Sequence, residues 1–338
     1  MIATHVTPHS LSELSRACLD VLSGRDVGKL FEEKVRQHLN SENFVTTSSG
    51  RRALYLALKA LSLKKGDEVI VPAFTIDLIP MILRKMGLVP VTVDARLDDY
   101  NMDSSLIPDV ISKKTKAVVA VHTFGCPSDL KSLRQICDDH GLFLVENAAS
   151  AFGAEYAGKP VGTFGDVGVL SFGFGKSISM GGAGGLVFND LELFKKIKLD
   201  TSGKHKGSIQ TFVETFGSII LANPVLYSMF GYKVKKRRVS TQYDCFDSEI
   251  PDDSSPSRLS YALGLNQIES RKYEDKRRIA LKYSGFLENM DGVETQKEGK
   301  NVRSVYSRYF VRAESKKMRD NCINEMIGLG IEPSIPIA

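Results

Sequence analysis

The sequence predicts an α/β protein with a mainly parallel central sheet, and two observations lead to this fold class. Between residues 50 and 190, short apolar runs rich in β-branched residues alternate with amphipathic stretches of helical period. The short runs are apolar at consecutive positions, which is typical of parallel strands that helices cover on both faces. At 338 residues, the chain is long enough for two domains.

The first half of the chain supplies the predicted sheet. Strands are expected at residues 68–72, 89–93, 117–121 and 142–146, with helices at 76–86 and 128–140. Ligands of open parallel sheets bind beyond the carboxyl ends of the strands, so the polar residues that follow these strands are candidates for a site. They are Thr75, Asp77, His122, Thr123, Glu146 and Asn147.

The second half departs from this alternation. Residues 191–255 predict a connecting region, and residues 257–290 have the pattern of one long helix. The elements expected after it are a strand at 309–312 and a helix at 316–328. We therefore predict a large α/β domain over residues 1–245 and a small α+β C-terminal domain over residues 246–338.

The composition argues against a nucleic-acid-binding protein and against a protein stabilised by metal sites or disulfides. The 45 basic and 40 acidic residues give a net charge of +5, which does not indicate nucleic-acid binding, because that requires a concentrated basic patch. The five cysteines include no CxxC pair, so neither a metal site nor a disulfide framework is predicted. We expect a reducing, cytoplasmic compartment, and the N-terminus does not have the pattern of a signal peptide.

One segment within the connecting region, residues 212–238, has two interpretations. Its apolar first part is followed by the basic residues Lys233, Lys235, Lys236, Arg237 and Arg238. Such a segment can lie on an anionic membrane surface, as a peripheral contact. We favour the alternative, in which short helices pack on the protein or at a dimer interface and the basic run is solvated.

Three motifs could carry chemistry, and each also has a plain structural explanation. Ser49, Gly50 and Arg51 open a helix whose N-terminus could hold a phosphate, although serine is also a common helix cap. Lys176 lies in a glycine-rich loop after a strand, where it is either a reactive amine or an exposed lysine. Asn147 ends a strand and precedes small residues against which a flat ligand could lie.

Together, the order and spacing of these motifs resemble the DegT/DnrJ/EryC1/StrS-type aminotransferases, which are pyridoxal-phosphate enzymes of fold type I. The resemblance extends from about Gly24 to the C-terminus and is densest over residues 47–190. It is carried by Ser49, Gly50, residues 66–72, Asp94, His122, Gly125, Glu146, Ala148, Gly165, Asp166, Ser171, Lys176, Gly184 and Gly185.

The resemblance implies a function and a role for each site residue. Lys176 would be the catalytic residue and would bind pyridoxal 5'-phosphate as a Schiff base. The implied cofactor-binding residues are Ser49, Gly50, Arg51, Ile76, Asn147, Ser150, Ser171 and Lys176. The implied reaction moves an amino group from an amino acid, with glutamate expected, to the keto group of a nucleotide-linked sugar. Such sites are built at a dimer interface, so a homodimer is also implied.

Several positions depart from the family pattern. Asn147 stands where an aspartate normally pairs with the pyridinium nitrogen, Ser150 where glutamine or histidine is usual, and Ile76 where an aromatic side chain often stacks on the cofactor. The chain is also shorter than relatives by several tens of residues, so we expect a shortened small domain. These departures leave two alternatives: a weakened or inactive, scaffold-like relative, or another pyridoxal-phosphate reaction such as sugar dehydration.

Overall fold

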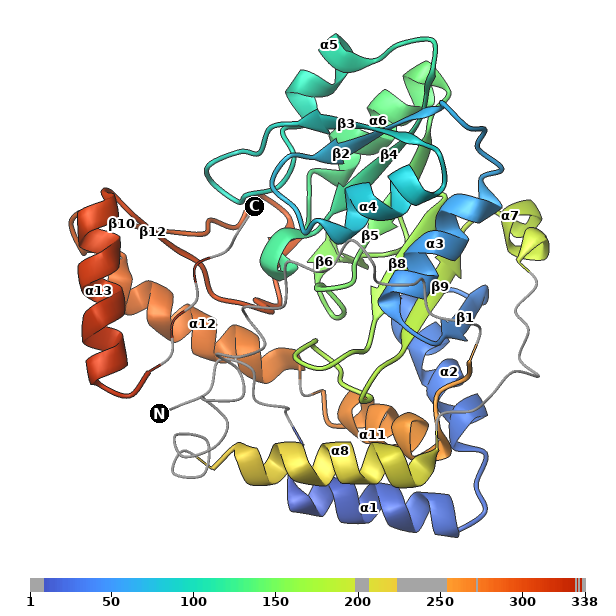
Figure 1. Ribbon diagram of the computed structural model, residues 1–338, viewed down its shortest axis with the longest axis vertical. Coiled ribbons are helices and arrows are strands. Elements are labelled where there is room, and N and C mark those ends of the chain that lie inside the picture. The colour runs from blue at the N-terminus through green and yellow to red at the C-terminus, as the bar shows by residue number, and fades with distance from the viewer. Residues whose placement is uncertain are drawn as a thin grey trace.

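The protein is built around a seven-stranded sheet that is covered by helices (Figure 1). The computed structural model describes residues 9–197, 207–223, 254–271 and 273–331, together with residues 333 and 335. From one edge of the sheet to the other, the strands are β1 (Phe44–Thr47), β9 (Gly184–Phe188), β8 (Val167–Ser171), β5 (Phe143–Asn147), β4 (Thr115–Val121), β2 (Glu68–Pro72) and β3 (Val89–Val93). All neighbours from β8 to β3 are parallel, whereas β9 is antiparallel to both β8 and β1. The predicted mainly parallel sheet is confirmed.

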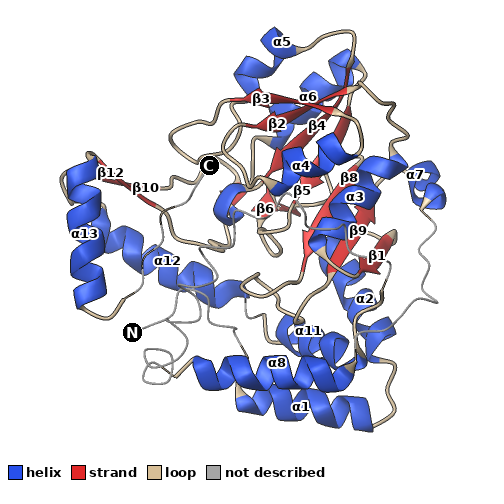
Figure 2. Cartoon of the chain, in the orientation of Figure 1, coloured by secondary structure: helices blue, strands red, loops and turns tan. Residues whose placement is uncertain are grey.

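Helices cover both faces of the sheet, which explains why the strands are apolar at consecutive positions (Figure 2). On one face, alternate strand residues pack against α3 (Gly50–Ala60), α4 (Leu78–Lys85) and α7 (Leu191–Lys196). On the other face, the intervening residues pack against α5 (Ile107–Val110), α6 (Leu130–His140) and α2 (Val27–Leu39). Side chains of a strand alternate between its faces, so each apolar run contributes to two separate clusters.

The C-terminal part contacts the large domain through strand pairing and aromatic packing. Its elements are α12 (Tyr273–Leu287), β10 (Val293–Thr295), β11 (Val302–Arg303), β12 (Val311–Ala313) and α13 (Lys316–Gly328). Strand β10 pairs with β12, whereas β11 pairs with β6 (Glu155–Tyr156) of the large domain, which also pairs with β7 (Lys159–Pro160). The ring of Phe310 stacks on Phe124, with ring centroids 5.1 Å apart. The division at residue 245 remains a prediction.

The single helix expected over residues 257–290 was wrong. The structure contains two helices, α11 (Arg258–Glu269) and α12, separated by a turn. Ser270 closes α11, and Arg271 adopts a left-handed conformation with φ of 51°. This conformation ends a helix because its backbone cannot continue the hydrogen-bond ladder. Neither proline nor glycine occurs at the turn. The helical pattern of the sequence therefore gave no signal that one helix ends and another begins there.

Helix α8 (Ser208–Leu221) lies beside α1 (Leu11–Leu22), and both pack against α11 (Figure 1). Helix α8 turns hydroxyl side chains inward: Thr211 and Thr215 are fully buried, and Thr211 Oγ1 lies 2.9 Å from Ser257 Oγ. Its apolar residues Phe212 and Val213 are exposed instead. The rest of the predicted 212–238 segment, including its basic run, lies outside the described residues. Within the described part of the chain, no helix has the length and apolarity to cross a membrane.

We predict that Gly168→Ala destabilises the fold. Gly168 lies on the buried strand β8, where an added Cβ would overlap the backbone carbonyl of Gly162. Because backbone cannot move as a side-chain tip can, we expect a loss of about 1–3 kcal/mol in the free energy of unfolding, measured by urea denaturation. The matched control is Gly285→Ala on α12, where the added Cβ meets open space. An equal loss in both variants would contradict this explanation.

Candidate functional site

The candidate residues gather at the edge of the sheet where β5 and β8 end. Asn147 is the last residue of β5, and Ser171 is the last residue of β8. The two strands are parallel neighbours, so their carboxyl ends lie together, as expected for the ligand edge of such a sheet. Lys176 lies on the loop that connects β8 to β9. The structure thus places these three predicted site residues at one edge.

The N-terminus of α3 forms a cradle for an anion beside Ser171. Ser49 caps the helix, and its hydroxyl accepts a hydrogen bond from Arg52 N–H. Gly50 begins the helix so close to Ser171 that an added Cβ would lie 2.8 Å from its Oγ. The first N–H groups of a helix have no intrahelical acceptor and carry a partial positive charge, so they bind anions. Arg51 follows in the first turn with an exposed side chain.

The amino group of Lys176 lies in an environment that favours its neutral form. Its Nζ donates a hydrogen bond of 3.0 Å to Ser150 Oγ. Desolvation by burial, together with the smaller effect of the nearby charges of Arg308 and Lys276, lowers the pKa of Lys176 to about 8. With that pKa, about a quarter of the amine is neutral at pH 7.5, against roughly one part in a thousand for an ordinary lysine. A neutral amine is the nucleophilic form.

Asn147 presents an amide donor at the end of β5. Its side chain is almost fully buried, and its Oδ1 accepts a hydrogen bond of 3.2 Å from Ala149 N–H. Because the oxygen is engaged, the Nδ2 donor is the group available to a ligand. An amide N–H favours an unprotonated ring nitrogen, whereas a carboxylate would favour a protonated one.

Ile76 follows a different strand from the other candidates. It precedes α4 on the loop that follows β2, and β4 separates β2 from β5 in the sheet. Its side chain is 60% exposed. Ile76 therefore lies at the carboxyl end of the strands, as the other candidates do. Its role in stacking on the cofactor remains a prediction.

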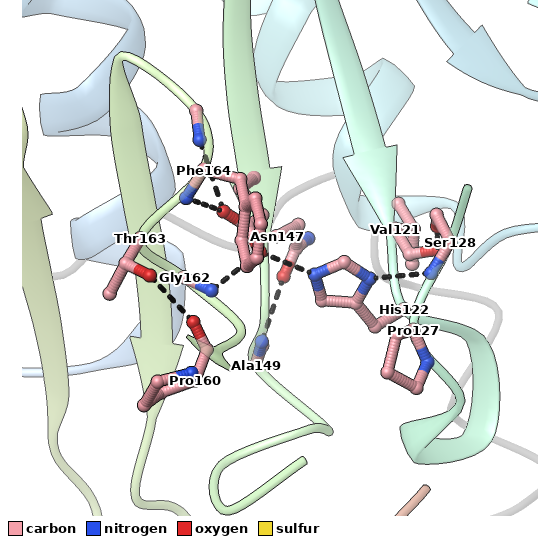
Figure 3. A network of polar contacts seen from close by, with 12 residues as sticks. Val121, His122, Pro127, Ser128, Asn147, Ala149, Pro160, Gly162, Thr163 and Phe164 are labelled. Carbon is pink, nitrogen blue, oxygen red and sulfur yellow. Dashed lines mark hydrogen bonds and ion pairs between the residues drawn. The ribbon is translucent and has the colours of Figure 1, made fainter. Parts of the chain in front are cut away.

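A buried network holds the end of β5 in place (Figure 3). Glu146 and His122 are both fully buried, with His122 Nε2 2.9 Å from Glu146 Oε1. The same carboxylate accepts hydrogen bonds from the backbone N–H groups of Gly162, Phe164 and Gly165. His122 Nδ1 accepts from Ser128 N–H, so Nε2 carries the hydrogen that points to Glu146.

This network supports the site without belonging to it. Successive side chains of a strand point to opposite faces, so Glu146 points away from the face on which Asn147 lies. His122 N–H donates a hydrogen bond of 3.2 Å to the Asn147 carbonyl, which ties β4 to the end of β5. The sequence marked His122 and Glu146 as polar residues after strands, and the structure shows them in a structural role.

Two cations near Lys176 were not identified from the sequence. Lys276, on α12, donates hydrogen bonds of 3.1 and 3.3 Å to the carbonyls of Gly175 and Lys176. Arg308 follows β11 and lowers the pKa values of both lysines. In the sequence, each is one charge among many in the C-terminal third, and no motif distinguishes it.

Comparison with known proteins agrees with this geometry. A model of the DegT/DnrJ/EryC1/StrS aminotransferase family matches residues 20–335. The chain belongs to this family. Its enzymes use pyridoxal phosphate, and solved structures of the same fold include forms with pyridoxal phosphate and with pyridoxamine phosphate. The predicted family, fold class and cofactor are confirmed.

Individual relatives show how far the likeness extends. A GDP-perosamine synthase of Escherichia coli O157:H7 is 29% identical over 95% of this chain and 79% of its own length. A GDP-perosamine synthase of Vibrio cholerae is 40% identical over 51% of this chain, and the chain spans 47% of that relative's length. The structure of DesV from S. venezuelae is 26% identical and has a TM-score of 0.72, covering 95% of this chain and 78% of that one.

The residues at the sheet edge fit the family's cofactor. The cradle formed by Gly50 and Ser171 suits a phosphate, and the amine of Lys176 suits an aldehyde. The amide of Asn147 suits a ring nitrogen that accepts a hydrogen bond.

We predict that Glu146→Gln strongly destabilises the protein. The amide would place its NH₂ group against backbone N–H donors that now face a carboxylate oxygen, leaving buried polar groups unpaired. We expect a loss on the order of 3 kcal/mol in the free energy of unfolding, measured by urea denaturation. Glu192→Gln, which changes an exposed pair with Lys195, is the control and should stay within about 0.5 kcal/mol. A stable Glu146→Gln protein would show that the network is dispensable.

Proposed function

We propose that the protein transfers an amino group from an amino acid to the keto group of a nucleotide-linked sugar, with pyridoxal phosphate bound at Lys176. The observation that carries this proposal is the amine of Lys176, whose pKa is lowered to about 8, on a loop that follows the strand ending at Ser171. Family membership supports the reaction class. Two relatives named GDP-perosamine synthase support a nucleotide-linked sugar as the acceptor.

Each predicted site residue receives a role in holding the cofactor. Lys176 would hold it covalently, and the phosphate would lie against the helix N-terminus. The residues assigned to the phosphate are Ser49, Gly50, Arg51 and Ser171. Asn147 would donate to the ring nitrogen, Ser150 would hold the Lys176 amine, and Ile76 would cover the ring. When bound, the cofactor supplies a carbonyl that carries the amino group and a ring that accepts electrons.

The protein's own residues supply proton transfer and orientation. An amine with a pKa near 8 can both accept and release a proton at physiological pH, which suits Lys176 Nζ as the acid–base group. Ser150 Oγ accepts a hydrogen bond from that nitrogen and thereby fixes its direction. The positive charges of Lys276 and Arg308 favour substrates that carry carboxylate or phosphate groups.

Asn147 makes this a milder catalyst than a family member with aspartate at the same position. A hydrogen bond to a charged group contributes about 1.5–3 kcal/mol, against about 1 kcal/mol for a neutral one. The amide therefore stabilises electron density on the ring less than a carboxylate would. The environment of Lys176 favours an active enzyme over an inactive scaffold. We further propose glutamate as the donor, a homodimer as the assembly and the cytoplasm as the location.

The first test concerns Lys176. Incubation of the purified protein with pyridoxal phosphate should give a visible absorbance band that borohydride reduction makes permanent. The rate of cofactor capture should rise with pH and level off above about pH 8, because the neutral fraction of the amine rises through its pKa. Lys176→Ala should lose the band, whereas Lys131→Ala, which changes an exposed lysine on α6, should keep it. Absence of the band in the unmodified protein would remove the basis for the enzymatic proposal.

The second test concerns Asn147. Asn147→Asp should raise the rate of the half-reaction with glutamate by roughly tenfold, because a carboxylate stabilises a protonated ring nitrogen. The measurement is a single-turnover spectrum of the cofactor-loaded protein mixed with glutamate. Asn147→Ala, which removes the donor without adding charge, should be slower than the unmodified protein. A slower Asn147→Asp variant would show that the site is adapted to the neutral amide.

A further inference from the structure

The side chain of Lys276 reaches the loop that carries Lys176, although the two residues are 100 positions apart in the sequence. Its Nζ lies 3.1 Å from the Gly175 carbonyl and 3.3 Å from the Lys176 carbonyl. Those carbonyls belong to the two consecutive peptide groups at the base of the reactive side chain. The proposed reaction assigns no chemical step to Lys276, so its position calls for another explanation.

Tyr273 anchors the start of α12 and thereby fixes the place of Lys276. Tyr273 is buried, and its ring lies 6.0 Å from that of Phe152 and 5.5 Å from that of His38. It also packs so closely on Gly153 that the glycine has no room for a Cβ. Residues three apart on a helix share a face, so Lys276 lies one turn beyond this anchor on the same side. The packing of Tyr273 therefore fixes the part of α12 from which the Lys276 side chain extends.

Lys176 lies between a glycine-containing turn and a segment held in the core, where Ile178 and Met180 are fully buried and Ser179 N–H donates a hydrogen bond of 2.8 Å to Gln267 Oε1. A hydrogen bond of 3.3 Å from Lys176 N–H to the Gly173 carbonyl closes the turn, and Gly175 adopts a φ of +78°. Glycine loses more conformational freedom on ordering than any other residue, so ordering this turn carries an entropic cost. Two hydrogen bonds from a charged donor are each stronger than neutral ones. The contacts from Lys276 therefore restrain the backbone at the reactive residue.

In the part of the chain that the structure describes, the charged groups that act on Lys176 are cations. The groups that shift the pKa of Lys176 besides burial are Arg308 and Lys276, both cationic, and its hydrogen-bond partner is the neutral Ser150. The acidic residues on and beside α12 are engaged elsewhere. The pairs are Glu274 with Arg303, Asp275 with Arg278, and Glu298 with Arg277. Cationic neighbours disfavour a second positive charge and so favour the neutral amine.

We propose that Lys276 is a positioning residue for Lys176, which fixes the loop backbone through two carbonyl hydrogen bonds and keeps the amine reactive through its charge. The catalytic importance of this role rests on the proposed function. Its effect on the reactivity of Lys176 does not, because it follows from contacts within the chain.

Reactivity of Lys176 can be measured without any cofactor. We suggest trace acetylation of the full chain with acetic anhydride across about pH 6–10, with the label at Lys176 quantified by mass spectrometry. The variants are Lys276→Met, which keeps the length and removes the charge and donors, and Lys276→Arg, which keeps the charge. Lys282→Met changes an exposed lysine on the same helix and is the matched control. Thermal unfolding of each variant verifies that it folds.

The expected result is an upward shift in the pH midpoint of Lys176 labelling in Lys276→Met only. A shift of about half a pH unit would lower labelling at pH 7.5 roughly threefold. Lys276→Arg should retain most of the original midpoint, and Lys282→Met all of it. An unchanged midpoint in a folded Lys276→Met protein would overturn the proposal. If Lys276→Met failed to fold, a Lys276→Arg midpoint equal to the original would support the charge effect, and a raised one would contradict it.

Capture of pyridoxal phosphate by the same proteins separates this inference from the proposed function. A shifted labelling midpoint together with slower capture in Lys276→Met supports both. A shifted midpoint in a protein that captures no cofactor supports the positioning role and contradicts the enzymatic proposal. Normal capture with an unshifted midpoint contradicts the positioning role alone.

Discussion

The site depends on the buried carboxylate of Glu146. A charge without solvent is tolerated in a protein only when hydrogen bonds satisfy it, and here backbone groups and His122 supply them. These bonds attach a loop of the chain to the end of β5, and His122 attaches the neighbouring strand through its own backbone. The position of Asn147, the next residue, follows from this arrangement. A buried polar network thus determines the position of the Asn147 amide, which we propose donates to the cofactor.

A second constraint is the close approach of α3 to strands β8 and β9. Gly50 touches Ser171, and Gly184 on β9 lies against the backbone of Ser49 and Gly50. Side chains at either glycine would push the helix away from the sheet edge, and with it the N–H groups that suit a phosphate. Both glycines were noted in the sequence, and the structure shows that they allow close packing of the helix on the sheet. The proposed phosphate site and the close packing of α3 on the sheet therefore depend on the same positions.

Most of the sheet and part of the site could be predicted from local signals. Strands β2, β3, β4 and β5 and helices α4, α6 and α13 were recognised because apolar period and length are local properties. Lys176 and Asn147 were singled out because they follow or end a predicted strand, and Ser171 was assigned through the resemblance to the family; their roles in the site remain proposals. The break at Arg271 could not be predicted, since a left-handed arginine has no distinctive sequence signal. Lys276 and Arg308 were missed because they lie far from Lys176 in the sequence. Folding of the C-terminal part against the sheet brings them close to it.

The attachment of α12 to the Lys176 loop links reactivity to domain placement. Helix α12 belongs to the C-terminal part, whereas the loop belongs to the large sheet. A small rotation of one part against the other would separate Lys276 Nζ from its two carbonyls while every strand and helix stayed intact. The nucleophile would then lose both its restraint and its charged neighbour at once. With Lys276 in the positioning role proposed above, the reactivity of Lys176 depends on how α12 lies against the sheet.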